Sequence, residues 1–185
     1  MPVSMNTAEP RNHFELFGLP VAFDVDQGLL NERYRELQKQ VHPDRFAGAS
    51  DRERLLSVQR TAEINEAYQA LKDPLKRARH LLELRGLDAA LESNTVMDRQ
   101  FLMEQMDLRE ELEVVGDADD PPQALEALRQ EIERRTTNLS TTLRQQLEGE
   151  DLQTLQDACD TLRKLRFMQR LREQALDLEE QLFPL

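Results

Sequence analysis

Apolar residues recur every three or four positions along most of this 185-residue chain. Such spacing places them on one stripe of an α-helix, the side that is buried when the helix packs. Only 6 glycines occur. Leu, Glu, Gln, Arg and Ala, which favour helices, dominate the composition. The sequence therefore predicts an all-α protein.

Proline, glycine and capping residues divide this pattern into helices. A short helix or turn is expected over Phe14–Leu19, and Asp24 or Asp26 could cap the helix that follows. Pro43 ends that helix, because the residue before proline avoids the helical region. The long helices are expected at Gln27–Val41, Asp51–Leu71, Pro74 to Gly86, Asp98–Val115, Leu125 to Gly149, and Asp151–Leu182.

The charge is uneven and suggests two modules. Residues 1–86 contain 13 basic and 13 acidic residues, whereas residues 87–185 contain 11 and 23, which is the whole net charge of −12. We expect a mobile tail at 1–11, a first domain at 12–86, a linker at 87–97 and a three-helix bundle at 98–185. The acidic half argues against nucleic acid as its partner, since phosphates need a basic face.

Several classes of protein are excluded at this stage. The single cysteine, Cys159, allows no intramolecular disulfide and no thiolate zinc cluster, and is expected to be a small buried hydrophobe. Residues 1–10 lack the apolar core of a signal peptide. No stretch approaches the roughly 18 apolar residues that a membrane span needs. A cytoplasmic protein without membrane contact is expected.

The tripeptide His42-Pro43-Asp44 lies in the loop expected between the first two long helices. Proline restricts the backbone, which lowers the entropy lost when the loop binds a partner. Asp44 can form a charge-assisted hydrogen bond to an arginine, and His42 can orient the loop or donate a hydrogen bond. Basic residues near the loop could face an acidic groove: Arg33, Arg35, Lys39 and Arg45.

Two other interpretations of the tripeptide are less favoured. It could serve only to cap and turn between helices. A catalytic His42–Asp44 pair would need a nucleophile or a metal held in a pocket, which a helical hairpin does not offer. The other histidines, His13 and His80, show no ligand spacing and are interpreted as surface or core-edge residues. We therefore expect no metal, no cofactor and no enzymatic activity.

The flanks of the tripeptide make the pattern specific. Tyr34-x-x-Leu37 precedes it, and Ile64-Asn65-Glu66-Ala67-Tyr68-x-x-Leu71-x-Asp73-Pro74 follows at the length of one helix. With these flanks, residues 12–86 resemble a J domain, the module by which co-chaperones engage DnaK-class chaperones. The resemblance implies that His42, Pro43 and Asp44, with the basic residues around them, bind the chaperone.

Residues 87–185 show which kind of J protein the chain resembles. They have neither the glycines nor the cysteines of the client domains in many J proteins. The segment from Thr95 to Leu112 and the later Leu162-Arg163-Lys164-Leu165-Arg166-Phe167 are similar to the second domain of the HscB family, J-type co-chaperones of iron–sulfur cluster assembly. This resemblance implies that the bundle binds the cluster scaffold IscU and that the J domain stimulates ATP hydrolysis by the chaperone HscA.

The same resemblance implies a scaffold-binding surface. Its residues are Leu102, Met103, Met106, Asp107, Glu110 and Phe167. Val114 stands where some relatives have an acidic residue, so a weaker charged part of this surface is expected.

Helical geometry alone also favours a patch here. At about 100° per residue, Phe101 and Leu108 share one face, and Leu102 and Met106 share another that Met103 borders. If the first face packs in the bundle, the second is partly exposed, and exposed apolar residues rimmed by acids mark a binding patch. The alternative is that these side chains fill the core or the contact with the J domain.

Phe167 lies off the expected core stripe of the last helix, which runs through Leu162, Leu165 and Met168. It is therefore expected near solvent or against a partner. The alternative is that this helix is buried on a wider face.

Four functions compete. The first is a co-chaperone of iron–sulfur cluster assembly, and the second is a J-domain co-chaperone of a DnaK-type chaperone with a different client. The third is a small enzyme that uses His42 and Asp44. The fourth, nucleic-acid binding, is disfavoured because Glu32 and Glu36 interrupt the basic face.

Overall fold

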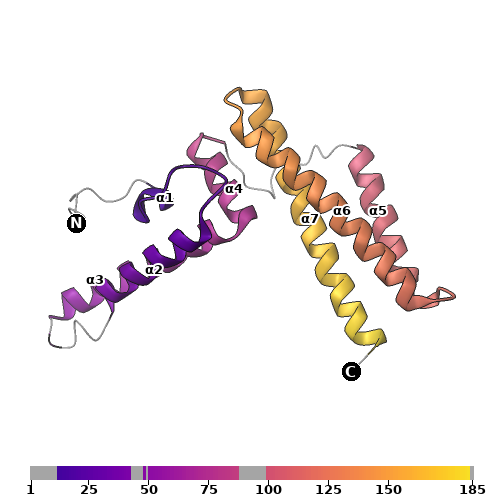
Figure 1. Cartoon of the computed structure of the whole chain (residues 1–185), viewed down its shortest axis with the longest axis horizontal. Coiled ribbons are helices and arrows are strands. Elements are labelled where there is room, and N and C mark those ends of the chain that lie inside the picture. Colours follow the sequence, from indigo (N-terminus) through magenta and orange to yellow (C-terminus); the bar gives the residue numbers. More distant parts are fainter. Residues whose placement is uncertain (1–11, 43–47, 49, 88–98, 184–185) are drawn as a thin grey trace. The chain divides into compact units, whose positions relative to one another are not determined.

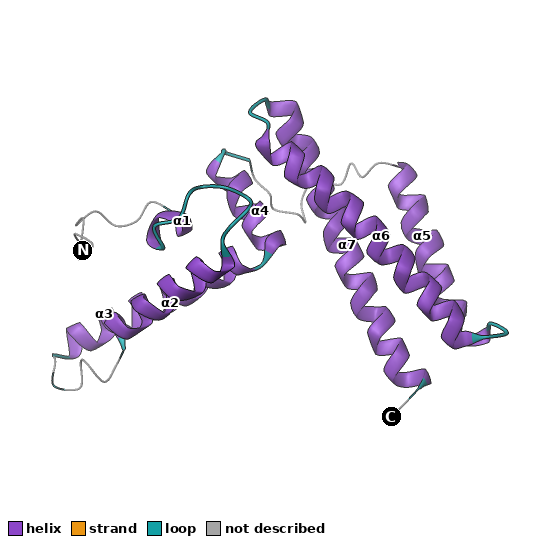
Figure 2. Ribbon diagram, in the orientation of Figure 1, coloured by secondary structure: helices purple, strands orange, loops and turns teal. Residues whose placement is uncertain are grey.

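The computed structural model describes residues 12–42, 48, 50–87 and 99–183. Over these ranges the regular structure is helical and no strand occurs (Figure 2). The all-α prediction is confirmed. The chain divides into two compact units, Met1–Arg85 and Gly86–Leu185. The tail expected at 1–11 and most of the linker expected at 87–97 lie outside the described residues.

The first unit contains four described helices (Figure 1). They are α1 (His13–Leu16), α2 (Gln27–Val41), α3 (Asp51–Lys72) and α4 (Pro74–Leu84). α2 and α3 pack side by side as a hairpin, and α1 and α4 pack against α3. Asp26 is the cap of α2, since its side chain accepts from the backbone N–H of Leu29 at 3.0 Å. Gly86 follows α4 with a φ of +79°, a value that favours glycine.

The core of this unit forms at the base of the hairpin. All four helices contribute fully buried side chains: Phe14, Phe17, Leu30, Ile64, Leu71, Leu81 and Leu82. Leu56 fits the apolar spacing of the buried residues Ile64 and Leu71 on α3, yet 54% of its surface is exposed. Ser57 is buried there instead, and its hydroxyl donates to the carbonyl of Val41 at 2.7 Å. The first turns of α3 therefore face α2 with a polar side chain.

Two tyrosines join the middle of the hairpin. The rings of Tyr34 on α2 and Tyr68 on α3 stack with centroids 4.0 Å apart. Tyr34 donates its hydroxyl to Asn65 at 2.9 Å, and Tyr68 donates to Asn31 at 2.7 Å. Each phenol thus bonds a side chain of the opposite helix, which fixes the register of α2 against α3.

The second unit is built on two long antiparallel helices. Its elements are α5 (Arg99–Val114), a 3₁₀ turn η2 (Val115–Asp117), α6 (Pro121–Glu148) and α7 (Leu152–Leu182). α6 and α7 pack along their lengths, and α5 contacts both of them (Figure 1). Asp151, where the last helix was expected to begin, caps α7 and accepts from the Thr154 N–H at 2.9 Å. Asp98, where the first helix of the bundle was expected to begin, lies outside the described residues.

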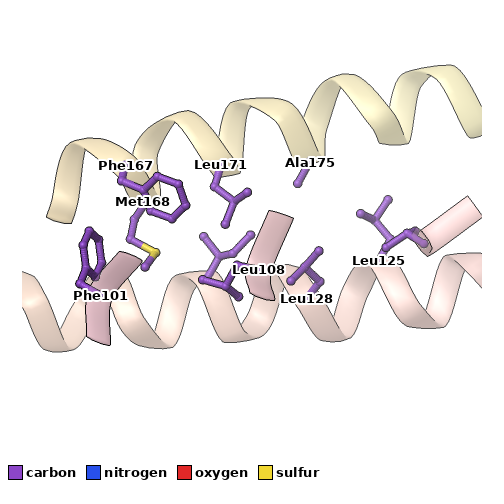
Figure 3. Close-up of a cluster of buried hydrophobic side chains, with 10 residues drawn as sticks. Phe101, Leu108, Leu125, Leu128, Phe167, Met168, Leu171 and Ala175 are labelled. Carbon is purple, nitrogen blue, oxygen red and sulfur yellow. The ribbon is translucent and has the colours of Figure 1, made fainter. Parts of the chain in front are cut away.

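One apolar cluster holds the three helices together. Figure 3 shows its side chains from α5, α6 and α7 pointing toward one another. It contains Phe101, Leu108, Val115, Leu125, Leu128, Ile132, Phe167, Met168, Leu171 and Ala175. Among the helices of the described ranges, none has the length and apolarity that crossing a membrane requires.

Candidate interaction surfaces

The first surface is the tip of the α2–α3 hairpin. α2 ends at Val41, and His42 follows with an extended backbone (φ −58°, ψ 132°) and an exposed side chain. Pro43, Asp44 and Arg45 lie outside the described residues. The bond from the Ser57 hydroxyl to the Val41 carbonyl uses an acceptor at a helix end, where carbonyls have no partner within the helix. It therefore fastens the point at which the loop leaves α2.

α3 begins beyond the loop with a capping box. The backbone N–H and hydroxyl of Ser50 donate to the Glu53 carboxylate at 2.9 and 2.7 Å, and the Ser50 hydroxyl accepts from the Glu53 N–H at 3.4 Å. These hydrogen bonds from Ser50 lower the pKa of the Glu53 carboxyl. The loop is thus bounded by two helix ends whose polar groups are bonded locally.

The basic residues predicted on α2 are not equivalent. Arg33 donates to Glu36 at 3.1 Å, so part of its charge is neutralised on its own helix. Arg35 and Lys39 are exposed and lie one turn apart on the same side of α2. Arg33, Arg35 and Lys39 all lie on the described helix that leads to His42.

The second surface is the outer side of α5. Phe101, Gln105 and Leu108 are buried, whereas Leu102, Met103 and Met106 are 42%, 60% and 70% exposed. The sequence-based prediction of two faces is confirmed, with the second face outward. Asp107 and Glu110, the acidic residues named with them, are exposed on the same helix. Val114, 53% exposed, adds an apolar side chain near its end.

The expectation that Phe167 lies near solvent was wrong. Its side chain is only 4% exposed, and its ring meets Phe101 edge to face with centroids 5.8 Å apart. The physical reason is the wide buried face of α7, on which both Phe167 and Met168 pack. Figure 3 shows Phe101 and Phe167 together at one end of the cluster. Phe167 packs against the buried side of α5 and is not part of the described outer surface.

Two cations flank this aromatic pair. The guanidinium carbon of Arg109 lies 5.5 Å from the Phe167 ring centroid, and the Lys164 ammonium lies 5.1 Å from that of Phe101. Each cation belongs to one helix and each ring to the other, so the contacts add cross-helix attraction. Arg135 on α6 lies 3.7 Å from Glu104 and forms a third link to α5. These contacts with α6 and α7 fix the position of α5 and therefore of its exposed residues.

Sequence reasoning missed one cluster in the first unit. His13 and His80, interpreted separately as surface or core-edge residues, stack on each other with ring centroids 4.1 Å apart. Sixty-seven positions separate them, so no spacing rule could have joined them. Within the described ranges, no group of three or more His, Cys, Asp or Glu side chains is placed to hold a metal ion.

Two family models match the chain. The DnaJ domain covers residues 12–80, and the HSCB C-terminal oligomerisation domain covers residues 97–176. Together they span both units, in the order in which the sequence analysis placed a J domain and a helical bundle.

Individual relatives agree over nearly the whole length. The co-chaperone protein HscB homolog of Shewanella loihica is 45% identical over 172 residues, which is 93% of this chain and 99% of the relative. The solved structure of chaperone HscB from Vibrio cholerae is 46% identical and covers 93% of this chain and 99% of its own, with a TM-score of 0.82. The crystal structure of human co-chaperone protein HscB is 29% identical with a TM-score of 0.83, over 96% of this chain and 86% of its own. The HscB relatives are co-chaperones, a family without enzymatic activity of its own.

Proposed function

The chain belongs to the HscB family of J-domain co-chaperones, and from that premise we propose that it brings an IscU-type iron–sulfur scaffold to an HscA-type chaperone. A J domain implies a partner chaperone of the Hsp70 kind. In this proposal the hairpin tip binds the chaperone and stimulates its ATP hydrolysis, while the outer side of α5 binds the scaffold. The protein assists iron–sulfur protein maturation in the cytoplasm.

The exposed patch on α5 is the observation that carries the scaffold half of the proposal. Three large apolar side chains, Leu102, Met103 and Met106, are exposed next to one another on one helix. Solvation alone does not favour such a cluster, and apolar groups rimmed by carboxylates are typical of a protein-binding surface. The flexible thioethers of Met103 and Met106 adapt to the shape of a partner.

The hairpin tip supports the chaperone half. His42 is exposed where the loop leaves α2, and Arg35 and Lys39 on the preceding turns carry positive charge. A positive helix beside a constrained loop suits an acidic groove, because long-range attraction speeds encounter and short contacts fix the orientation. Pro43, Asp44 and Arg45 complete this proposed site.

The benefit of joining the two surfaces is physical. A scaffold bound to one unit is held near a chaperone bound to the other, so its effective concentration there rises. The co-chaperone itself performs no covalent chemistry.

Calorimetric titration with a purified IscU-type scaffold tests the first half. We expect saturable binding by the parent and a loss of at least about tenfold in affinity for the Leu102→Ala/Met103→Ala variant, the size expected for residues at the centre of an interface. Leu152→Ala is the matched control, since Leu152 is an exposed apolar residue of the same unit but lies on α7. Phe167 is left intact here, because its loss would disturb the fold.

Two outcomes of this titration would contradict the proposal or the position of its site. Absence of binding by the parent would contradict the scaffold role and favour the second candidate, a J-domain co-chaperone with a different client. Equal binding by parent and variant would move the site away from α5.

Steady-state ATP hydrolysis by an HscA-type chaperone tests the second half. His42→Gln is expected to abolish stimulation while the circular dichroism spectrum stays unchanged. Lys76→Gln, a change of one exposed polar residue on α4, is the control and should stimulate normally. Undiminished stimulation by the His42 variant would exclude the tip, and turnover of any substrate without a partner would favour an enzyme.

A further inference from the structure

Two histidines that are far apart in the sequence of the first unit are in contact. His13 is the first residue of α1, and His80 lies on α4. Their imidazole planes are inclined by only 22°, with centroids 4.1 Å apart, and the His80 ring also stacks on Phe14 at 5.8 Å. Both imidazoles are half-buried. The histidine pair therefore forms a direct contact between α1 and α4.

A hydrogen bond within the pair depends on protonation. The backbone N–H of His13 belongs to the first turn of α1, where N–H groups have no partner inside the helix. It donates to Nε2 of His80 at 3.4 Å. A ring nitrogen that accepts a hydrogen bond carries no proton, so this bond requires a neutral His80 with its hydrogen on Nδ1. A second proton would occupy Nε2 and remove this acceptor.

Burial and the neighbouring carboxylates shift the pKa values of the two histidines in opposite directions. Burial lowers the pKa of His13, against the carboxylates of Glu66 on α3 and Glu83 on α4. Burial, followed by the neighbouring His13 ring, lowers the pKa of His80, again against Glu83. Arg79, which precedes His80 in the sequence, is bonded to Glu83 at 2.6 Å, which weakens the field of that carboxylate. The neutral state of both rings is the favoured one in the folded protein.

α1 depends on tertiary contacts for its position. Its helix has only four residues, far too short to be stable without tertiary packing. Phe14 and Phe17, which lie in and directly after it, are buried in the core of the first unit. α1 is thus held by these two buried rings and by its packing on α3, and the histidine pair adds a contact with α4.

We propose that the histidine pair is an acid-sensitive fastening of α1, a contact that strengthens the docking of this segment on the J domain at neutral pH and weakens when either ring gains a proton. The direction of the pH dependence follows from the preference of the folded protein for neutral rings. The fastening is complete above the ordinary histidine pKa of about 6.5 and weakens as the pH falls below that value through the lower pKa of the folded state. The pair titrates as a unit, since a proton on one ring opposes a proton on the other.

Hydrogen exchange on the full chain tests this. Four backbone N–H groups report the docking of α1, those of Leu16, Phe17, Gly18 and Leu19, because each donates within the segment. After correction for the chemical exchange rate, we expect their protection to fall by about tenfold for each unit by which the pKa is lowered, between about pH 7.5 and about pH 5.5. Amides of α6 and α7 serve as the internal reference and should keep their protection.

Two variants separate protonation from packing. His80→Phe keeps a ring for stacking but cannot titrate at position 80, so its α1 protection is expected to fall less in acid than that of the parent, because only His13 can still gain a proton. His42→Gln removes the remaining histidine, which lies outside the pair, and should preserve the acid response. An equal acid response in parent and His80→Phe protein would overturn the proposal, as would unchanged α1 protection in the parent.

Imidazole ¹⁵N spectra of the parent protein give a measurement that needs no variant. We expect the unprotonated nitrogen of His80 to be Nε2 at neutral pH, and His80 to titrate below the ordinary histidine pKa of about 6.5. A midpoint at or above that value, or a neutral ring protonated on Nε2, contradicts the proposal. Neither measurement requires a chaperone or a scaffold, so this proposal stands or fails separately from the proposed function.

Discussion

Phe101 on α5 and Phe167 on α7 meet edge to face, with ring planes at 86° and centroids 5.8 Å apart. Both side chains are 4% exposed, whereas the next two residues of α5, Leu102 and Met103, face outward. The buried pair and the exposed patch therefore follow each other directly along one helix. Phe167 affects the patch by fixing the helix that carries it.

Replacement of Phe167 by alanine is expected to lower the free energy of unfolding by about 3–5 kcal/mol, the usual cost of removing a buried phenylalanine. Urea denaturation measures this loss. Met106→Ala, a truncation of the most exposed residue of the patch, should change stability by no more than about 0.5 kcal/mol. A Phe167→Ala protein of parental stability would show that the ring contributes little to the packing of α5.

Ser57 offers a second test at the hairpin tip. Ser57→Ala removes the donor to the Val41 carbonyl, a bond with a net contribution of about 1 kcal/mol. The backbone amides in the last turn of α2 should then exchange about fivefold faster. Thr61→Ala is the control, since the Thr61 hydroxyl donates only within α3, to the carbonyl of Ser57. Equal exchange in the last turn of α2 in parent and Ser57→Ala protein would show that the bond does not hold the tip.

The sequence predicted best those features that residues within or next to a single helix determine. α2 occupies the predicted Gln27–Val41, because a capping aspartate and a proline in the loop define its ends locally. The two faces of α5 were also predictable, since helical pitch separates Leu102 and Met106 from Phe101 and Leu108.

Prediction failed where neighbouring elements decide burial. Leu56 fits the apolar period of α3, but the hairpin turns Ser57 toward α2 at this point and leaves Leu56 exposed. Phe167 departs from a narrow stripe, yet two packed helices bury a wider face of α7. The stacking of His13 on His80 arises only from the tertiary fold, which no local pattern encodes.

Arg77 provides a third test, at the corner between α3 and α4. Its guanidinium is buried and donates from Nη1 to the carbonyl of Leu71 at 2.6 Å, and it lies 5.1 Å from the ring centroid of Phe23. Arg77→Met keeps much of the volume but leaves that buried carbonyl without this donor, a cost of about 1–3 kcal/mol. The exposed neighbour Arg79 gives the matched control, Arg79→Met, for which little change is expected. Thermal unfolding followed by circular dichroism compares the two, and equal midpoints would contradict the structural role of Arg77.

Glu131 on α6 gives a prediction about acid pH. Hydrogen bonds from Arg134 and then from Arg135 hold its pKa down to about 2, against an ordinary value of 4.5. The ionised form is thus favoured by folding, so its contribution to stability is present above about pH 4.5 and is lost as the pH falls through about 2. That contribution is small, because the side chain remains 30% exposed and solvent screens the pair.

The pKa itself is therefore the quantity to measure, by following the Glu131 carboxyl carbon in a pH titration by NMR. Arg134→Gln should raise the pKa more than any other single change, since the bond from Arg134 is the largest cause. Arg129→Gln is the control on the same helix, because Arg129 donates to Glu179 at 2.7 Å. Arg135 also lies 3.7 Å from Glu104, so the same charge group connects α6 to the helix that carries the exposed patch. A parental pKa near 4.5 would mean that these arginines do not hold Glu131 in solution and that this connection to α5 is weaker than the structure indicates.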